Sequence, residues 1–183
     1  VPKEGVAQLI EVFHEENLVI MPVRKWYDYV YDVQALASLK GKKNARHRNQ
    51  VNKFKRAYPQ YLYRAITTSE DIAKVKVFLI EFMEQQAMKN ETGDYELTQL
   101  NEAFDHFFEL GYHGAYLEVD QKVVAITYGD ILGDTLFVHV EKALRAYEGS
   151  YAMINHLFAS DHVNQVTYVN REDDIDDEDL IPQ

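Results

Sequence analysis

The middle of the chain alternates apolar and polar residues in three short runs, at residues 115–119, 123–132 and 136–141. Two turn signals, Asp120-Gln121 and Gly133-Asp134, separate the runs. A period of two residues is typical of strands with one buried face, and Gly and Asp favour the tight turns of hairpins. The pattern predicts a three-stranded antiparallel meander.

Helical periodicity surrounds this meander. Apolar residues recur at intervals of three and four in five segments, which are residues 5–17, 33–58, 72–83, 97–110 and 151–158. Pro59 should end the helix at residues 33–58, and Gly41 should break or kink that helix. Gly111 should end the helix at residues 97–110. Shorter strand signals fall at residues 18–23, 27–31, 61–66 and 166–169.

Composition narrows the class of protein. The chain has 183 residues, of which 46% are hydrophobic and 13% aromatic, enough for the core of one domain, or of one domain with an incomplete neighbour. The absence of cysteine excludes disulfides, thiolate metal sites and a cysteine nucleophile, and fits a reducing cytoplasm. No window holds the roughly 20 apolar residues of a membrane span. We therefore expect a cytoplasmic protein without stable membrane insertion.

A basic run stands out against the acidic background. Residues 40–56 hold eight of the nineteen lysines and arginines and no carboxylate, whereas the whole chain has a net charge of −11. We expect this run to bind the phosphate of a donor molecule. The predicted ligands are Lys42, Lys43, Arg46, Arg48, Asn49 and Lys53. The alternative is a solvated helix face, paired with the acidic tail.

One predicted strand places two titratable residues, His139 and Glu141, on the same face. Either is a candidate base that would take a proton from an attacking amine. The alternative is ordinary hydrogen bonding within the sheet, with Lys142 as an exposed partner. We predict no metal site, because the histidines lack a spacing that would gather metal ligands.

Three motifs together resemble the phosphatidylglycerol lysyltransferase C-terminal-like family over residues 27–175. They are GKK with RNQVNKF (residues 41–54), VHVEKA with EGSYAMIN (residues 138–155) and YVNREDD (residues 168–174). The resemblance implies an α+β fold of the GNAT-like (acyl-CoA N-acyltransferase) type, with a mixed, mostly antiparallel sheet flanked by helices. Residues 1–27 would be a remnant of, or linker from, a preceding GNAT-like half. Residues 28–171 would form the GNAT-like domain, and 172–183 a disordered acidic tail.

The resemblance also implies transfer of an acyl or aminoacyl group to an amine or hydroxyl. The donor would be acyl-CoA or aminoacyl-tRNA, and the missing glycine-rich pyrophosphate loop favours the acceptor end of tRNA. No cofactor is implied beyond this donor. The substrate-binding candidates are His47, Asn52, Lys142, Asn155, Asn170 and Arg171.

The chain departs from the family pattern at two places. Gln50 stands where the family has histidine, and after Asp174 the chain becomes acidic instead of continuing into a basic segment. Val1 is not expected to be the native start. We therefore expect a homodimer or a missing tandem half to complete the protein. The alternative function is a noncatalytic domain that binds an anionic ligand or a partner.

Overall fold

The computed structural model describes residues 3–14, 17–19, 21, 28–87 and 93–171. The chain divides into two units, and the larger, Asp28–Glu172, contains the whole sheet. The smaller unit combines Val1–Tyr27 with Asp173–Gln183, and its described helix is α1 (Lys3–Phe13). The predicted acidic tail and part of the predicted strand at 18–23 lie outside the described residues.

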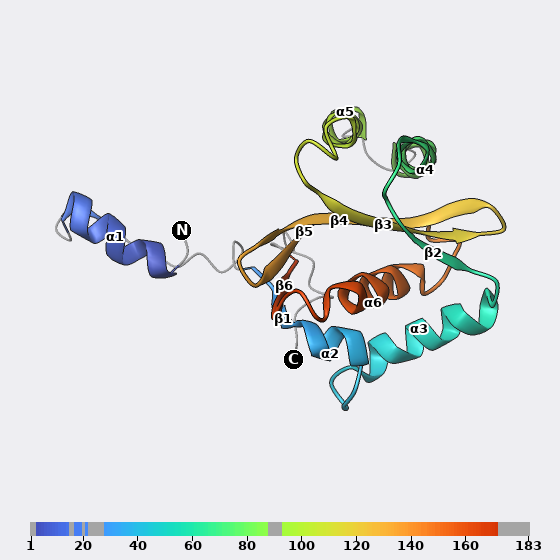
Figure 1. Ribbon diagram of the computed structural model, residues 1–183, viewed down its shortest axis with the longest axis horizontal. Helices are drawn as coiled ribbons and strands as arrows, with labels where there is room; N and C mark the ends of the chain where they lie inside the picture. The colour runs from blue at the N-terminus through green and yellow to red at the C-terminus, as the bar shows by residue number, and fades with distance from the viewer. Residues whose placement is uncertain (1–2, 15–16, 20, 22–27, 88–92, 172–183) are drawn as a thin grey trace. The chain divides into compact units, whose positions relative to one another are not determined.

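A six-stranded sheet forms the centre of the larger unit (Figure 1). Its strands lie in the order β1-β6-β5-β4-β3-β2, and all neighbours are antiparallel except β5 and β6, which are parallel. The bounds are β1 (Val30–Asp32), β2 (Leu62–Ala65), β3 (His113–Val119), β4 (Lys122–Leu132), β5 (Thr135–Ala143) and β6 (Tyr168–Asn170). The predicted meander is thus confirmed as β3–β5, and the α+β class with it.

Helices cover both faces of this sheet (Figure 1). One face carries α2 (Val33–Ser38), α3 (Ala45–Ala57) and α6 (Ser150–His162). The other carries α4 (Ser69–Ala87) and α5 (Gly93–Asp105). Each face buries its own apolar core, because β3 and β4 point side chains alternately to the two sides. Phe54 and Leu117 belong to the α6-side core, and Phe78 and Tyr116 to the α4-side core.

The helix predicted over residues 33–58, with a break or kink at Gly41, is two separate helices. Leu39 ends α2 in the left-handed region at φ 51°, and Gly41 follows at φ 87°. Arg48 of α3 fastens the loop between the helices, since its Nη1 donates to the carbonyl oxygens of Leu39 at 2.6 Å and Gly41 at 3.1 Å. The break separates Lys42 and Lys43 from the helix on which sequence periodicity had placed them.

A β-bulge interrupts the pairing of β4 with β5. Tyr128 lies opposite Val140 and Gly129 opposite Val138, so His139 is an extra residue on β5. An extra residue shifts the alternation of side chains beyond it. His139 therefore contacts Tyr128 on the α4 side, whereas Glu141 contacts α6 on the other. The prediction that His139 and Glu141 share one face is wrong for this reason.

Candidate active site

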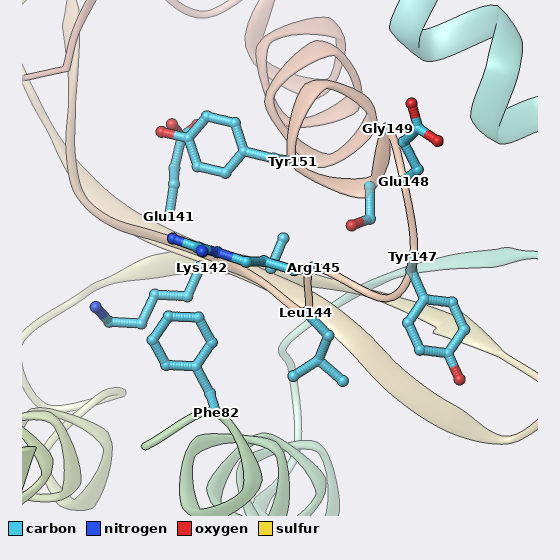
Figure 2. Close-up of a pocket in the computed structure, with 11 residues that line it drawn as sticks. Phe82, Glu141, Lys142, Leu144, Arg145, Tyr147, Glu148, Gly149 and Tyr151 are labelled. Atoms are coloured by element: carbon cyan, nitrogen blue, oxygen red, sulfur yellow. The ribbon is translucent and has the colours of Figure 1, made fainter. Parts of the chain in front are cut away.

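A pocket of about 440 Å³ opens where β5 ends and the chain turns into α6 (Figure 2). Residues 141–145 and 147–151 line it, together with Phe82 from α4. The turn depends on Gly149, which has φ 86°. A Cβ atom at Gly149 would lie 2.5 Å from the carbonyl oxygen of Gln50 on α3. Only glycine therefore allows α6 to begin this close to α3.

A buried polar cluster lies beside the pocket, where β5, β6 and α6 meet. Glu141 is its centre: Oε1 accepts a hydrogen bond from Nδ2 of Asn155 at 2.9 Å, and Oε2 accepts one from Nε of Arg171 at 3.0 Å. Nη2 of Arg171 also bonds Oε2 of Glu141, and it donates to the hydroxyl oxygen of Tyr151 at 2.6 Å. The Glu141 and Arg171 side chains are only 6% and 11% exposed. We call these four residues the Glu141 cluster.

The carboxylate of Glu141 raises the pKa values of Arg171 and Tyr151, two other members of the Glu141 cluster. Burial alone would lower the pKa of Arg171, but the carboxylate of Glu141 overrides it and raises that pKa. Burial and the Glu141 charge raise the pKa of Tyr151 to about 12. At neutral pH the cluster therefore holds a buried ion pair and a protonated phenol that lines the pocket.

His47 lies next to the Glu141 cluster from α3. Burial, and then the positive charge of Arg171, lower the pKa of its imidazole, so the ring is neutral at pH 7. Its Nε2 and the Oδ1 of Asn155 are buried and have no hydrogen-bond partner among the described residues. Unpaired buried polar atoms are uncommon in folded proteins and mark a place that calls for a functional explanation.

The structure thus brings together four of the sequence-predicted residues: His47, Glu141, Asn155 and Arg171. Lys142 lines the same pocket from the opposite face of β5, where its Nζ lies 2.5 Å from Glu96 and 5.0 Å from the centre of the Phe82 ring (Figure 2). The alternative interpretation, in which Lys142 is an exposed partner, is not met, since its side chain is 16% exposed.

The structure places other predicted residues away from this pocket. Nε2 of His139 lies 3.2 Å from Oδ1 of Asp130, and neither residue lines the pocket. Nδ2 of Asn170 donates to Asp28 at 2.7 Å and so ties β6 to the start of β1.

The basic run is only partly available to a ligand. Arg48 is bonded to backbone carbonyl groups, and Nζ of Lys53 lies 2.5 Å from Glu148, which lines the pocket. The remaining predicted phosphate ligands and the substrate-binding candidate Asn52 are exposed and make no side-chain interaction within the described part of the chain; the phosphate ligands are Lys42, Lys43, Arg46 and Asn49. Asn52 faces solvent on α3 and not the pocket.

Sequence reasoning missed two residues of the site, Tyr151 and Arg145. Tyr151 precedes Asn155 by four residues on a predicted helix, so the two share one face, and this spacing was the available signal. Arg145 follows the end of β5 and lines the pocket, but nothing in its local sequence distinguishes it from a surface arginine.

The fold and site define an α+β domain with a buried ion pair beside a pocket at a strand-to-helix turn. Residues 5–174 match the family described as phosphatidylglycerol lysyltransferase, C-terminal, and the chain belongs to this family. Among curated proteins, none matches.

Three solved structures are similar to this chain. A conserved protein of unknown function from Bacteroides thetaiotaomicron is 36% identical, with a TM-score of 0.87 over 97% of this chain and 60% of that one. L-PGS from Bacillus licheniformis is 13% identical, with a TM-score of 0.58 over 90% of this chain and 49% of that one.

The third is the C-terminal domain of a putative lysylphosphatidylglycerol synthetase from Agrobacterium fabrum. It is 15% identical, with a TM-score of 0.58 over 81% of this chain and 46% of that one. The two distant matches show a shared fold. The chain spans from 46% to 60% of the length of these three proteins.

Among the described residues, no helix combines the length and the apolar character that crossing a membrane requires. Nor do three or more His, Asp or Glu side chains gather there in a way that would hold a metal ion.

Proposed function

We propose that this chain is a transferase domain that moves an acyl or aminoacyl group from a phosphate-bearing donor to an amine or hydroxyl. The observation that carries the proposal is the Glu141 cluster, a buried ion pair hydrogen-bonded to an amide and a phenol beside a pocket. Family membership supports it, because the family is described by a lysyltransferase activity. The donor would be aminoacyl-tRNA or acyl-CoA.

The topology supports a GNAT-like fold. In the larger unit an antiparallel run from β2 to β5 is followed by α6, and the chain then returns as β6, parallel to β5. The pocket lies where β5 ends and α6 begins, which is the strand end expected to border an acyl-transfer cleft.

We assign the reaction steps to residues as follows. The acceptor nitrogen or oxygen attacks the carbonyl carbon of the donor ester or thioester, and its proton passes to a base. The bond to the donor oxygen or sulfur then breaks, and that leaving group takes up a proton. Of the two predicted bases, Glu141 is the one that lines the pocket. Arg171 and the Tyr151 hydroxyl lie beside it, where they would stabilise the negative charge that develops on the carbonyl oxygen.

Glu141 already accepts three hydrogen bonds, one from Asn155 on Oε1 and two from Arg171 on Oε2. Because a carboxylate has roughly four lone-pair sites, Oε1 keeps a lone pair that would accept the proton. The donor phosphates would lie along Arg46 and the loop lysines, Lys42 and Lys43. Lys53, which pairs with Glu148, would connect that surface to the pocket.

The test is transfer of a labelled amino acid or acetyl group from each donor by the full chain. Glu141→Gln should lose nearly all turnover, because the amide cannot accept the proton, and a native circular-dichroism spectrum at the assay temperature shows that the variant is folded. Glu102→Gln, on the exposed side of α5, is the matched control and should keep its rate. An unchanged rate in Glu141→Gln would remove Glu141 from the mechanism.

A second function is favoured by the hydrogen bonds that hold Glu141. With three donors bonded to its carboxylate, the cluster also fits a noncatalytic domain that binds an anionic ligand. Such a domain would bind its ligand with no turnover from either donor, whereas the transferase would show turnover that depends on Glu141.

A further inference from the structure

The charged residues that line the pocket leave one positive charge without a partner. Glu141, Lys142, Arg145 and Glu148 line it. Three of them pair with residues outside the lining: Glu141 with Arg171, Lys142 with Glu96, and Glu148 with Lys53. Arg145 has no hydrogen bond or ion pair within the described residues. The pocket and its partners therefore carry a surplus of one positive charge.

The unpaired arginine is part of the pocket wall. Figure 2 shows its side chain extending from the turn back toward Glu141 and Lys142, with Tyr151 on one side and Phe82 on the other. Glu141 pairs with Arg171 and bonds Asn155, and it forms no hydrogen bond or ion pair with Arg145. Arg145 therefore keeps its donors available to a ligand that enters the pocket.

The remaining walls are largely apolar and aromatic. Phe82, Leu144, Tyr147 and Tyr151 contribute them. A volume of about 440 Å³ lies in the range of small-molecule sites, roughly 300–1,000 Å³. The lining therefore fits a small ligand that combines an apolar or aromatic group with an anion.

We propose that this pocket binds a small monocarboxylate, with the carboxylate held by Arg145 and the apolar part against Phe82 and Tyr147. A carboxylate offers two coplanar oxygens that match the guanidinium fork. Its single negative charge equals the surplus of the site. A dianionic phosphate ester would leave excess negative charge beside Glu141 and Glu148. This binding does not depend on the proposed transferase function. Only a role of the ligand as the acceptor in transfer would depend on it.

The test is calorimetric binding to the full chain without any donor, with N-acetylphenylalanine as the probe. Its carboxamide has the same shape without the charge and should bind at least tenfold more weakly, since it cannot form charge-assisted hydrogen bonds with the guanidinium. Phenyl phosphate should also bind more weakly than the carboxylate. Equal affinity for the carboxylate and the carboxamide would overturn the proposal, as would tighter binding of the phosphate or no binding of any probe.

Variants locate the contact. Arg145→Gln should abolish the preference for the carboxylate over the carboxamide, and Arg145→Lys should keep part of it because the charge remains without the fork. Arg56→Gln, an exposed arginine of α3 outside the pocket lining, is the control and should bind like the native chain. Native binding in Arg145→Gln, at a native melting temperature, would overturn the assignment. Turnover without carboxylate binding would refute this inference and leave the proposed transferase function intact. Carboxylate binding without turnover would support this inference and count against the transferase function.

Discussion

His139 and Glu141 are separated by one residue on β5, yet their side chains lie on opposite faces of the sheet. The bulge between Tyr128 and Gly129 is the cause, because His139 has no residue opposite it on β4. Glu141 consequently reaches the pocket and the Glu141 cluster, whereas His139 pairs with Asp130 among the aromatic rings of the α4 side. A single extra residue thus decides which of the two can take part in chemistry at the pocket.

The buried ion pair should contribute to stability in a way that an exposed pair does not. Glu141→Ala would leave the guanidinium of Arg171 buried and unpaired, and we expect the free energy of unfolding to fall by about 3–5 kcal/mol. Glu148→Ala breaks the exposed pair with Lys53 and should cost less than about 1 kcal/mol. Urea denaturation of both variants measures the difference. Equal losses would show that the Glu141 pair is not buried as described.

The imidazole of His47 should remain neutral at pH values where an ordinary histidine is protonated. Burial and Arg171 lower its pKa, so folding disfavours the protonated form. The pKa of His47 is lower in the folded than in the unfolded protein. Its effect on the free energy of unfolding is therefore fully favourable above about pH 6.5, and stability declines as the pH falls below that value. NMR titration of the ring protons should give a midpoint below 6.5, and Arg171→Gln should raise that midpoint. A midpoint at or above 6.5 in the native chain would contradict the placement of His47.

The sequence predicted most elements of the sheet because their signals are local. Alternation and turn residues located β3, β4 and β5, and helical spacing at residues 72–83 located α4. Gly41 indicated the break between α2 and α3, but α2 already ends before it, because Leu39 adopts a left-handed conformation that its side chain does not favour. That conformation persists because Leu39 is buried and its carbonyl oxygen accepts a hydrogen bond from Arg48.

The sequence predicted candidate site residues only where the side chain could accept a proton or donate directed hydrogen bonds. Glu141, Asn155 and Arg171 were found in this way, although their mutual contacts depend on the parallel pairing of β5 with β6. The phosphate ligands predicted at Arg48 and Lys53 could not be assessed from the sequence, because Arg48 bonds backbone carbonyl groups of the preceding loop and Lys53 pairs with Glu148, 95 residues later. Whether a lysine or arginine has an ion-pair partner depends on the fold, which is why the sequence did not predict Arg145 as a site residue.

Asp71 should make the fold sensitive to acid. Thr68 and Asp71 form a reciprocal cap at the start of α4: Asp71 N donates to Oγ1 of Thr68 at 3.2 Å, and Thr68 N donates to Oδ2 of Asp71 at 2.9 Å. Although burial opposes it, hydrogen bonds from Thr68 and its neighbours lower the pKa of Asp71 to about 2.

Because the folded pKa is depressed, the stabilisation by Asp71 is present above about pH 4 and is lost as the pH falls toward 2. Asp71→Asn should destabilise the protein by about 1 kcal/mol at pH 7 and flatten the loss of stability between pH 4 and 2. Acid titration followed by circular dichroism checks this, with Asp120→Asn, in an exposed turn, as the control. An unaltered acid transition in Asp71→Asn would contradict the role of the cap.

Gly149 should be irreplaceable for a reason beyond its backbone conformation. Gly149 and Gly111 both have positive φ, 86° and 69°, so alanine is strained at either position by roughly 1–2 kcal/mol. At Gly111 an added Cβ meets nothing within 4 Å, whereas at Gly149 it would lie 2.5 Å from the carbonyl oxygen of Gln50 and 3.1 Å from Cβ of Phe54. The difference in the loss of unfolding free energy between Gly149→Ala and Gly111→Ala therefore reports the close approach of α6 to α3. Overpacking predicts a difference of about 1–3 kcal/mol.

Thermal unfolding of the two variants measures this difference. Equal melting temperatures would mean that the turn can move away from α3 at no cost, and the pocket that the turn frames would then be adaptable and not fixed by packing.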